Sequence, residues 1–410
     1  MSTTDPLRAA ETSIRALAER EGTAAFLVGG TVRDRLRRRR PRDLDVAIEG
    51  DAIAFARAWG RARGIAIESS DAFGTASARI GGGPRARRVD FSSTRGERYP
   101  HPGALPEVFP AGIEEDLRRR DFTVNAMAIP LTGPARGAVL DPHGGREDLR
   151  RGVVRMLHAR SPHDDPTRAC RAVRFALRFG FRIGAETRRW IAEAISAGSF
   201  SAVSGDRLRR ELKLLFSEQP PARAASGLAR LGLDRAIDPG LAATAAARRR
   251  LRRLEEISRG ASDETRFLAA LLAWGLDLPG EDRRRVAVRL GLAGEAGSIY
   301  VRAAADLADL KTRLSGGSAE SEIAAFARGL GEAEALALES ALGPRQAARF
   351  RSARRKASRV RLAIRGEDLK RSGMAPGPAI GRALERTWRA RVDGRIRPAD
   401  ELAFALREAE

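Results

Sequence analysis

The sequence predicts an α+β protein in which a mixed β-sheet with flanking helices is followed by helices alone. The apolar run at 24–28 stops at Gly29-Gly30, which is typical of a buried strand ending in a tight turn. Strand-like and helical patterns then alternate as far as residue 145. From Ala185 onward the apolar residues recur at helical spacing only, so we expect the second half to be helical.

The N-terminal elements follow in order. The pattern at 6–20 predicts a covering helix, and 51–63 repeats it. Thr31 is expected to cap a helix after the glycines, whose first N–H groups are then left for an anion such as phosphate. The segment 94–110 is rich in Gly, Pro and charge, so we expect a mobile loop. The predicted strands are 24–28, 43–48, 65–68, 77–80, 88–91 and 139–141.

Helices with arginine-rich faces are expected through most of the second half. Trp274 and Phe267 have apolar neighbours, which favours a place in the core over base stacking. Short helices are expected at the C-terminal end, with a turn at 376–378. The predicted helices are 186–197, 205–216, 223–231, 243–257, 265–276, 281–290, 298–314 and 321–330.

Composition narrows the partners of the chain. Its 410 residues are 43% hydrophobic, enough for more than one domain. Lys and Arg number 75 against 53 Asp and Glu, and the net charge of +22 favours a polyanionic partner. The single cysteine, Cys170, excludes an intrachain disulfide and a cysteine-rich zinc site. The sequence shows no signal-peptide core and no long uncharged run, so we expect a cytoplasmic protein with no membrane partner.

Asp43 and Asp45 stand two residues apart in a predicted strand, so their side chains share a face. Neighbouring carboxylates repel each other unless water or a divalent cation separates them. One interpretation is an exposed edge strand with Asp43 closing the loop as a turn residue. The double glycine before them favours a metal, because a phosphate-cradling turn beside a carboxylate pair is what nucleotidyl transfer requires.

A family resemblance rests on this stretch and on several later blocks. GGTVRD at 29–34 followed by DLD at 43–45 resembles the signature of the class II tRNA nucleotidyltransferases, which include the CCA-adding enzymes and related bacterial poly(A) polymerases. Further blocks follow in that family's order: RRDFTVNAMAI at 119–129, DPHGGREDLRRGVVR at 141–155, DDPTRACRAVRFALRFGF at 164–181, SGDRLRRELKLLF at 204–216 and, more weakly, GEDLKRSGMAPGPAIGRAL at 366–384.

The resemblance implies four parts and a reaction. The parts are a nucleotidyltransferase head at 1–145, a helical neck with base recognition at 146–216, a helical body at 217–345 and a tRNA-binding helical tail at 346–410. The reaction is template-independent addition of CCA, or part of it, to the tRNA 3′ end from CTP and ATP, releasing pyrophosphate. A poly(A) polymerase and an enzyme adding only CC or only A are alternatives. A non-catalytic basic RNA-binding protein is the alternative of another class, and no DNA partner is expected.

The same resemblance implies the catalytic and nucleotide-binding residues. Asp43 and Asp45 would hold two Mg²⁺ ions, and Asp90 would be a third catalytic carboxylate, although its pattern equally fits a solvent-facing residue. Arg120 is the implied phosphate or ribose contact. Asp121 and Asn125 could as easily be a cap and a solvated polar residue. The implied nucleotide-binding set is Gly29, Gly30, Arg33, Arg120, Asp121, Asn125, Asp165, Arg168, Arg171 and Arg174.

The segment 166–179 predicts a helix that Asp164-Asp165 begins, with proline in its first turn. Its arginines follow at spacings of three and lie along one face, which by itself indicates only an N-capped, arginine-decorated helix. The resemblance makes Asp165 and Arg168 a protein template for the incoming base, because a carboxylate accepts and a guanidinium donates at a Watson–Crick edge. Arg171 and Arg174 would face the triphosphate or support the template.

Overall fold

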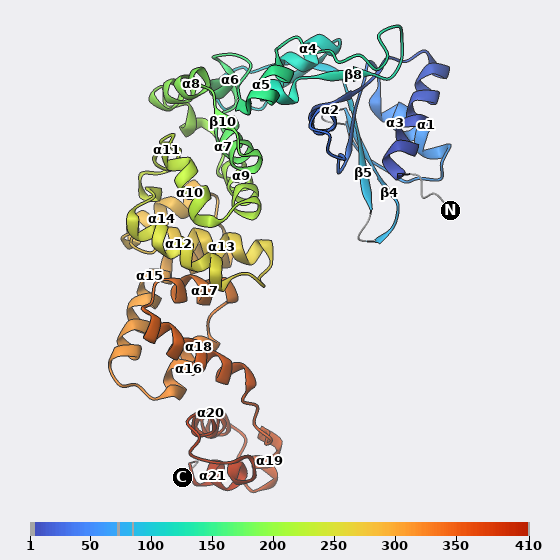
Figure 1. Cartoon of the computed structure of the whole chain (residues 1–410). Coiled ribbons are helices and arrows are strands. Elements are labelled where there is room, and N and C mark those ends of the chain that lie inside the picture. Colours follow the sequence, from blue (N-terminus) through green and yellow to red (C-terminus); the bar gives the residue numbers. More distant parts are fainter. Residues whose placement is uncertain (1–4, 72–73, 84–85, 409–410) are drawn as a thin grey trace. The chain divides into compact units, whose positions relative to one another are not determined.

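The computed structural model describes residues 5–71, 74–83 and 86–408. The chain forms two compact units, Met1–Glu211 with Arg230–Ala236, and Leu212–Ala229 with Ile237–Glu410. All strands of the described residues belong to the first unit, and the second is helical (Figure 1). This confirms the predicted fold class. The division into head, neck, body and tail remains a prediction.

A mixed six-stranded sheet organises the described part of the first unit, in the order β3-β4-β5-β2-β1-β8. β2 and β5 run parallel, while the other neighbours are antiparallel. The β2–β5 register sets Asp45 opposite Asp90, so both side chains lie on one face. The strands are β1 (Ala25–Val28), β2 (Leu44–Ile48), β3 (Ile67–Ser70), β4 (Thr75–Ile80), β5 (Arg87–Ser93) and β8 (Ala128–Pro130).

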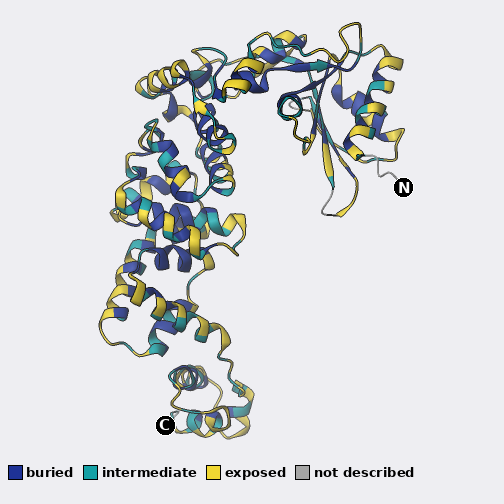
Figure 2. Ribbon diagram, viewed as in Figure 1, coloured by how far each residue is buried: buried dark blue, intermediate teal, exposed yellow. Residues whose placement is uncertain are grey.

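Helices cover both faces of this sheet. α1 (Pro6–Glu21) and α3 (Ala52–Arg61) pack on one face, where Trp59 and Phe91 are buried. α4 (Ile113–Arg118) buries Leu117 against residues of the other face. Figure 2 shows buried residues running through the strands, which places the core in the sheet.

α2 (Gly29–Leu36) begins directly after β1, so the prediction that Thr31 caps it is wrong. Val28 takes the cap position, and Thr31 is the third helical residue. The Thr31 hydroxyl instead accepts from the Asp45 backbone N–H at 2.8 Å and donates to the Asp43 carbonyl at 3.2 Å. Its side chain therefore ties the helix to β2.

The segment predicted as a mobile loop forms an antiparallel hairpin of β6 (Arg95–Arg98) and β7 (Glu107–Pro110). A Cβ at Gly96 would lie 2.2 Å from the Phe109 ring, so a larger residue here would have to displace this exposed ring. The strand predicted at 139–141 is also wrong, because only Leu140 pairs there, as an isolated bridge to Ala128.

Helices and short strands complete the first unit. α7 begins at Thr167, while Asp164 ends the preceding short helix instead of starting this one. Asp165 lies between the two helices, and its Oδ1 accepts from the Thr167 N–H at 3.0 Å. The elements are η3 (Thr123–Asn125), α5 (Gly145–Arg151), β9 (Val153–Val154), α6 (Ser161–Asp164), α7 (Thr167–Phe179), β10 (Arg182–Ile183), α8 (Ala185–Ser196), η4 (Ser199–Ala202), α9 (Gly205–Glu218), which continues into the second unit from Leu212, and α11 (Leu233–Ile237), whose last residue belongs to the second unit.

The helices predicted for the second half are confirmed to within a few residues, and Trp274 and Phe267 are buried as expected. No helix within the described ranges has the length and apolar character needed to cross a membrane. The helices are α10 (Pro221–Ala229), η5 (Pro239–Leu241), α12 (Ala245–Ile257), α13 (Asp263–Trp274), α14 (Gly280–Arg289), α15 (Gly294–Ser315), α16 (Glu320–Arg328), α17 (Glu332–Ser340), α18 (Pro344–Arg359), α19 (Gly366–Arg371), α20 (Pro378–Val392), η6 (Pro398–Asp400) and α21 (Glu401–Arg407).

Candidate active site

A cavity of about 700 Å³ in the first unit is lined by the sheet, the β6–β7 hairpin and α7. Its described wall carries more arginines than carboxylates, which suits a polyphosphate. Asp43 and Arg174 are the predicted site residues that do not line it. Those that do are Gly29, Gly30, Arg33, Asp45, Asp90, Arg120, Asp121, Asn125, Asp165, Arg168 and Arg171.

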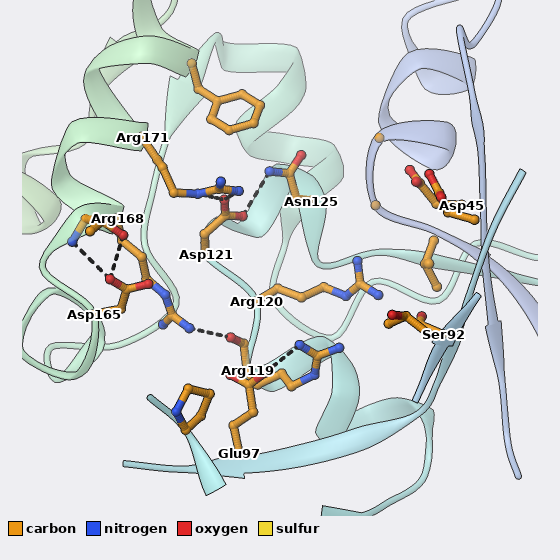
Figure 3. A pocket seen from close by; sticks show the side chains of 18 of the residues that line it. Asp45, Ser92, Glu97, Arg119, Arg120, Asp121, Asn125, Asp165, Arg168 and Arg171 are labelled. Atoms are coloured by element: carbon orange, nitrogen blue, oxygen red, sulfur yellow. Dashed lines mark hydrogen bonds and ion pairs between the residues drawn. The ribbon is translucent and has the colours of Figure 1, made fainter. Parts of the chain in front are cut away.

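Asp45 and Asp90 form the sheet end of the cavity (Figure 3 labels Asp45). Burial raises the pKa of Asp45, and the neighbouring Asp90 charge raises it further, while Arg120 opposes the shift. Burial also raises the pKa of Asp90, although the ion pair of Asp90 with Arg88 at 2.6 Å opposes this shift. The two carboxylates are thus held close together with incomplete neutralisation, as in a site that takes a cation.

The two glycines allow the chain to approach Asp45 closely. A Cβ on Gly30 would lie 3.3 Å from Asp45 Oδ2, and one on Gly29 would lie 3.0 Å from Arg120 Nη1. Gly29 also has a φ of +59°, which L side chains rarely adopt. The Thr31 N–H points at Asp45 Oδ2 at 3.3 Å, so this helix N–H is used by the carboxylate and not left for a phosphate.

Asp43 lies just before β2 and is exposed. Its Oδ1 accepts from the Arg88 backbone N–H at 3.3 Å. Across the described ranges, no three Asp, Glu, His or Cys side chains are grouped as a metal site. A pair of carboxylates is nevertheless enough for Mg²⁺, which keeps several waters and takes further ligands from substrate phosphates.

Arg120 reaches across the middle of the cavity toward Asp45 (Figure 3). Its Nη2 pairs with Asp116 Oδ2 at 2.8 Å, and Asp116 Oδ1 pairs with Arg119 Nη2 at 2.7 Å. Asp116 is fully buried, yet the two arginine charges outweigh its burial and lower its pKa. Arg119 also binds Glu97 of the hairpin at 2.9 Å. Buried Asp116 therefore fixes both arginines at the cavity wall.

A continuous polar network, here called the arginine relay, forms one side of the cavity at its α7 end, opposite the sheet end. Arg33 Nη1 donates to Asn125 Oδ1 at 2.7 Å, and Asn125 Nδ2 donates to Asp121 Oδ1 at 2.9 Å. Arg171 donates to Asp121 Oδ2 at 2.6 Å and contacts Glu211 at 3.4 Å. Arg174 pairs with the other Glu211 oxygen at 3.4 Å. These contacts favour a supporting role for Arg174 over contact with a triphosphate.

In the arginine relay the pKa of the buried aspartate, Asp121, shifts in the opposite direction to that of Asp45 at the sheet end. Burial opposes ionisation of Asp121, but the Arg171 charge and the hydrogen bonds from Asn125 and Arg171 outweigh it, so its pKa is lowered. Asp121 and Asn125 are both buried, which excludes the solvated position that the pattern also allowed. The Phe122 N–H bonds Asp121 Oδ1 at 2.8 Å, so Asp121 additionally holds the start of this turn.

Arg168 is buried and held by three partners at the cavity wall. Its guanidinium donates to Ser161 Oγ at 2.9 Å, to the Arg119 carbonyl at 2.8 Å and to the Tyr99 hydroxyl at 3.2 Å. Five N–H groups are available on a guanidinium, so donors remain for a ligand. Asp165, which the sequence analysis paired with Arg168 as a template for the incoming base, forms an ion pair with Arg207 at 2.7 Å.

Sequence reasoning missed several residues of this wall. Glu97 and Tyr99 belong to the hairpin that we expected to be a loop, so no pattern marked them. Arg119 and Arg207 lie inside the blocks at 119–129 and 204–216, where the resemblance offered a signal that was not carried to these residues.

Comparison with known proteins identifies the family. Residues 25–155 match the poly A polymerase head domain. The chain is 32% identical to the CC-adding tRNA nucleotidyltransferase of Deinococcus radiodurans, over 95% of this chain and 91% of that one. The chain belongs to the class II tRNA nucleotidyltransferase family. It is also 33% identical to the A-adding tRNA nucleotidyltransferase of Geobacter sulfurreducens, over 94% of this chain.

The structural comparison covers the whole fold. A CCA-adding enzyme in apo form superposes with a TM-score of 0.85 at 29% identity, covering 98% of this chain and 95% of that one. The Thermotoga maritima CCA-adding enzyme complexed with tRNA gives a TM-score of 0.80 at 29% identity, covering 100% and 97%. The match spans 45% of the Geobacter relative and 55% of an A-adding relative from Halalkalibacterium halodurans, about half their lengths. Activity, substrates and partners are therefore taken up as proposals.

Proposed function

We propose that this protein adds nucleotides to the 3′ end of tRNA from CTP and ATP without a nucleic-acid template, releasing pyrophosphate. The observation that carries the proposal is the single cavity that joins Asp45 and Asp90 to Arg120 and the α7 arginines. Nucleotidyl transfer needs carboxylates for a cation and fixed positive groups for the triphosphate. Related structures of CCA-adding enzymes with ATP and with CTP support these substrates.

Asp43 and Asp45 would hold two Mg²⁺ ions, with Asp90 beside them. The raised pKa of Asp45, caused by burial and by Asp90, fits a site that gains from a divalent cation. When bound, the metal would activate the terminal ribose hydroxyl and stabilise the charge that develops on the α-phosphate and pyrophosphate. Arg120, fixed by Asp116, would neutralise a phosphate.

The α7 end would select the base. Arg168 keeps unused donors and is immobilised by Ser161 and Tyr99, which suits a group that must read hydrogen-bond positions. Asp165 would accept from an exocyclic amine, positioned by Arg207. The arginine relay would hold this end in place. We expect the protein to act in the cytoplasm, on tRNA bound through the basic surface.

A defined set of tRNAs tests the proposal. The pure protein is incubated with Mg²⁺ and labelled CTP or ATP, together with tRNA lacking the whole CCA end, lacking its last two nucleotides or lacking only the final adenosine. We expect CMP or AMP to be added to at least one of these tRNAs at its native position. Failure to extend any of them, with correctly folded protein, would refute the proposal.

The same assay separates full from partial addition. Relatives named A-adding and CC-adding both align along most of this chain, so a partial reaction is a specific alternative. Addition of only AMP to a tRNA ending in CC, or of only CMP to one lacking CCA, would identify it. Long runs of AMP on unrelated RNA would instead identify a poly(A) polymerase.

A further inference from the structure

The face of the sheet that carries Asp90 continues across β4 and β3 as a groove. Two smaller cavities of the first unit, of about 420 Å³ and 340 Å³, lie along it. The larger one shares Thr75, Asp90 and Ser92 with the active-site cavity. The smaller one shares Ser77 and Arg88 with the larger. The three cavities are therefore adjacent, and together they follow β4 and β5 away from the carboxylates.

The strand order places this groove on one side of the carboxylates and the triphosphate contacts on the other. β2 with Asp45 and β5 with Asp90 lie between β4 and β1. Gly29 follows β1 and lies beside Arg120, whereas the groove lies over β4. In an in-line displacement the attacking hydroxyl and the leaving group are on opposite sides of the reacting phosphate. The acceptor strand is therefore expected to arrive from the β4 side.

Arg88 connects the groove to the carboxylates. Its Nε donates to Asp90 Oδ1 at 2.6 Å, and its backbone N–H donates to Asp43 Oδ1 at 3.3 Å. Its side chain is nevertheless 59% exposed, so the other guanidinium N–H groups remain available to a ligand in the groove. One oxygen of Asp90 is thus occupied by an arginine that can instead bind an anion.

A second arginine stands opposite Arg88. In the β4–β5 register Arg79 pairs with Arg88, and Arg79 forms no hydrogen bond or ion pair with the described residues. Like charges at directly opposed positions of a sheet are destabilising, so this pair favours an anion nearby. The hydroxyls of Ser77 and Thr75 supply further donors. Glu68 on β3 lines the outer side of the groove and would repel an anion, so it is no part of the binding set.

We propose that the acceptor RNA runs along this groove, and that Arg88 binds its last backbone phosphate, which draws the guanidinium off Asp90 and frees that carboxylate for the cation. Arg79 adds a second donor for the same phosphate. Arg88 is thus a positioning residue for Asp90, because an arginine and a divalent cation compete for one carboxylate oxygen. It keeps the site incomplete until RNA has arrived, which protects the nucleotide from transfer to water. The inference rests on the proposed function and names its acceptor contact.

The first experiment measures binding of tRNA lacking its CCA end, in EDTA and without nucleotide. One form of this tRNA has a normal backbone, and the other has a neutral methylphosphonate at its last linkage. The wild type is compared with Arg88→Gln and with Arg87→Gln, whose exposed arginine lines none of the three cavities. We expect the neutral linkage to weaken binding about tenfold in the wild type and in Arg87→Gln. In Arg88→Gln, whose affinity is already lowered, the neutral linkage should have no further effect.

The second experiment repeats the titration of the normal tRNA in Mg²⁺. Its readout is the ratio of the dissociation constants in EDTA and in Mg²⁺. Binding free energies are linked reciprocally, so a phosphate that strengthens cation binding is itself bound more tightly in Mg²⁺. We expect a larger ratio in the wild type and in Arg87→Gln than in Arg88→Gln, since the response of the tRNA itself is common to all three. Arg88→Lys, which keeps the charge, should restore part of the difference, and melting curves show that the variants are folded.

The inference requires both results. An effect of the neutral linkage that is the same in all three proteins, or a ratio that is the same, overturns it. If the protein nevertheless extends tRNA, the proposed function stands without this contact. A protein that gives both results but extends no tRNA would refute the proposed function and leave Arg88 as an RNA contact.

Discussion

The two ends of the cavity in the first unit treat buried aspartates in opposite ways. At the sheet end, burial and the Asp90 charge raise the pKa of Asp45. At the α7 end, Arg171 and Asn125 overcome burial and lower the pKa of Asp121. Both side chains line one cavity, so their different neighbours account for the contrast. A carboxylate left short of positive charge is prepared for a cation, whereas one saturated with donors holds protein groups in place.

The largest expected effect is at the sheet end. Asp45→Asn keeps the size of the side chain and removes its charge, so incorporation of CMP and AMP should fall by about a thousandfold or more. Ionised Asp45 opposes folding, because its folded-state pKa is raised, so the melting temperature should not fall. Steady-state incorporation and thermal melting measure the two effects.

Glu68→Gln on exposed β3 is the matched control and should leave activity unchanged. Asp43→Asn should act in the same direction as Asp45→Asn. Turnover near the wild-type rate in Asp45→Asn would contradict the proposal that the sheet end of the cavity binds the metal.

The next effect is on stability, at the other end. Asp121→Asn leaves partly exposed Arg171 without its closest charge partner, although Glu211 remains, and loss of a hydrogen-bonded charge contact of this kind costs about 1–3 kcal/mol. The lowered pKa means that ionised Asp121 stabilises the fold above about pH 4 and loses this effect as pH falls through the folded-state pKa. Chemical denaturation should give a lower free energy of unfolding for Asp121→Asn than for the wild type. This difference should become smaller at acidic pH.

Glu147→Gln, which breaks an exposed pair with Arg150, serves as its control and should not measurably change stability. An Asp121→Asn variant as stable as the wild type would remove the contrast between the two ends.

A smaller effect concerns selection of the base. Arg168→Ala keeps the carboxylates and glycines of the sheet end, so chemistry should persist while discrimination fails. One bidentate base contact contributes about 1–3 kcal/mol, so misincorporation of UTP or GTP should rise roughly ten- to a hundredfold. Competition between labelled nucleotides measures it, with a melting curve to check folding. An equal loss for all four nucleotides would instead make Arg168 a phosphate or structural group.

The smallest effect tests the hairpin. Tyr99→Phe removes a hydroxyl that accepts from Arg168 at 3.2 Å and donates to Glu97 at 2.9 Å. Loss of one such hydrogen bond is worth about 1 kcal/mol, so selectivity should fall severalfold with little change in the rate for the correct nucleotide. Unchanged selectivity would show that Arg168 is positioned without the hairpin.

Local sequence was enough for most of the fold, since helices and strands with a strong apolar period were placed correctly. The β6–β7 hairpin was missed because all residues of β7 are exposed and leave no alternating pattern. What holds it is the cross-strand contact of Phe109 with Gly96 and the pairing of Glu97 with Arg119 of the segment after α4. Neither contact is visible in a local window.

The candidate site was predictable as a set of residues but not as a set of contacts. The resemblance brought Asp45, Asp121 and Arg168 into one list, and the structure places them around one cavity. The resemblance did not reveal that Asp121 accepts several hydrogen bonds from charged and polar groups while Asp45 does not, because these contacts come from residues far away in the chain. Arg171 and Asp121, for example, are 50 residues apart.

The arginine relay sets a limit on exchanging parts between relatives. It links α2 through Arg33, the η3 turn through Asn125, α7 through Arg171 and α9 through Glu211. A chimera that takes α7 alone from a relative would place foreign cations against resident carboxylates, with charges left unmatched in the interior. The smallest segment that can be transplanted with its polar contacts intact therefore extends from α2 to the first half of α9, and inherited substitutions along it are expected to arise in compensating pairs.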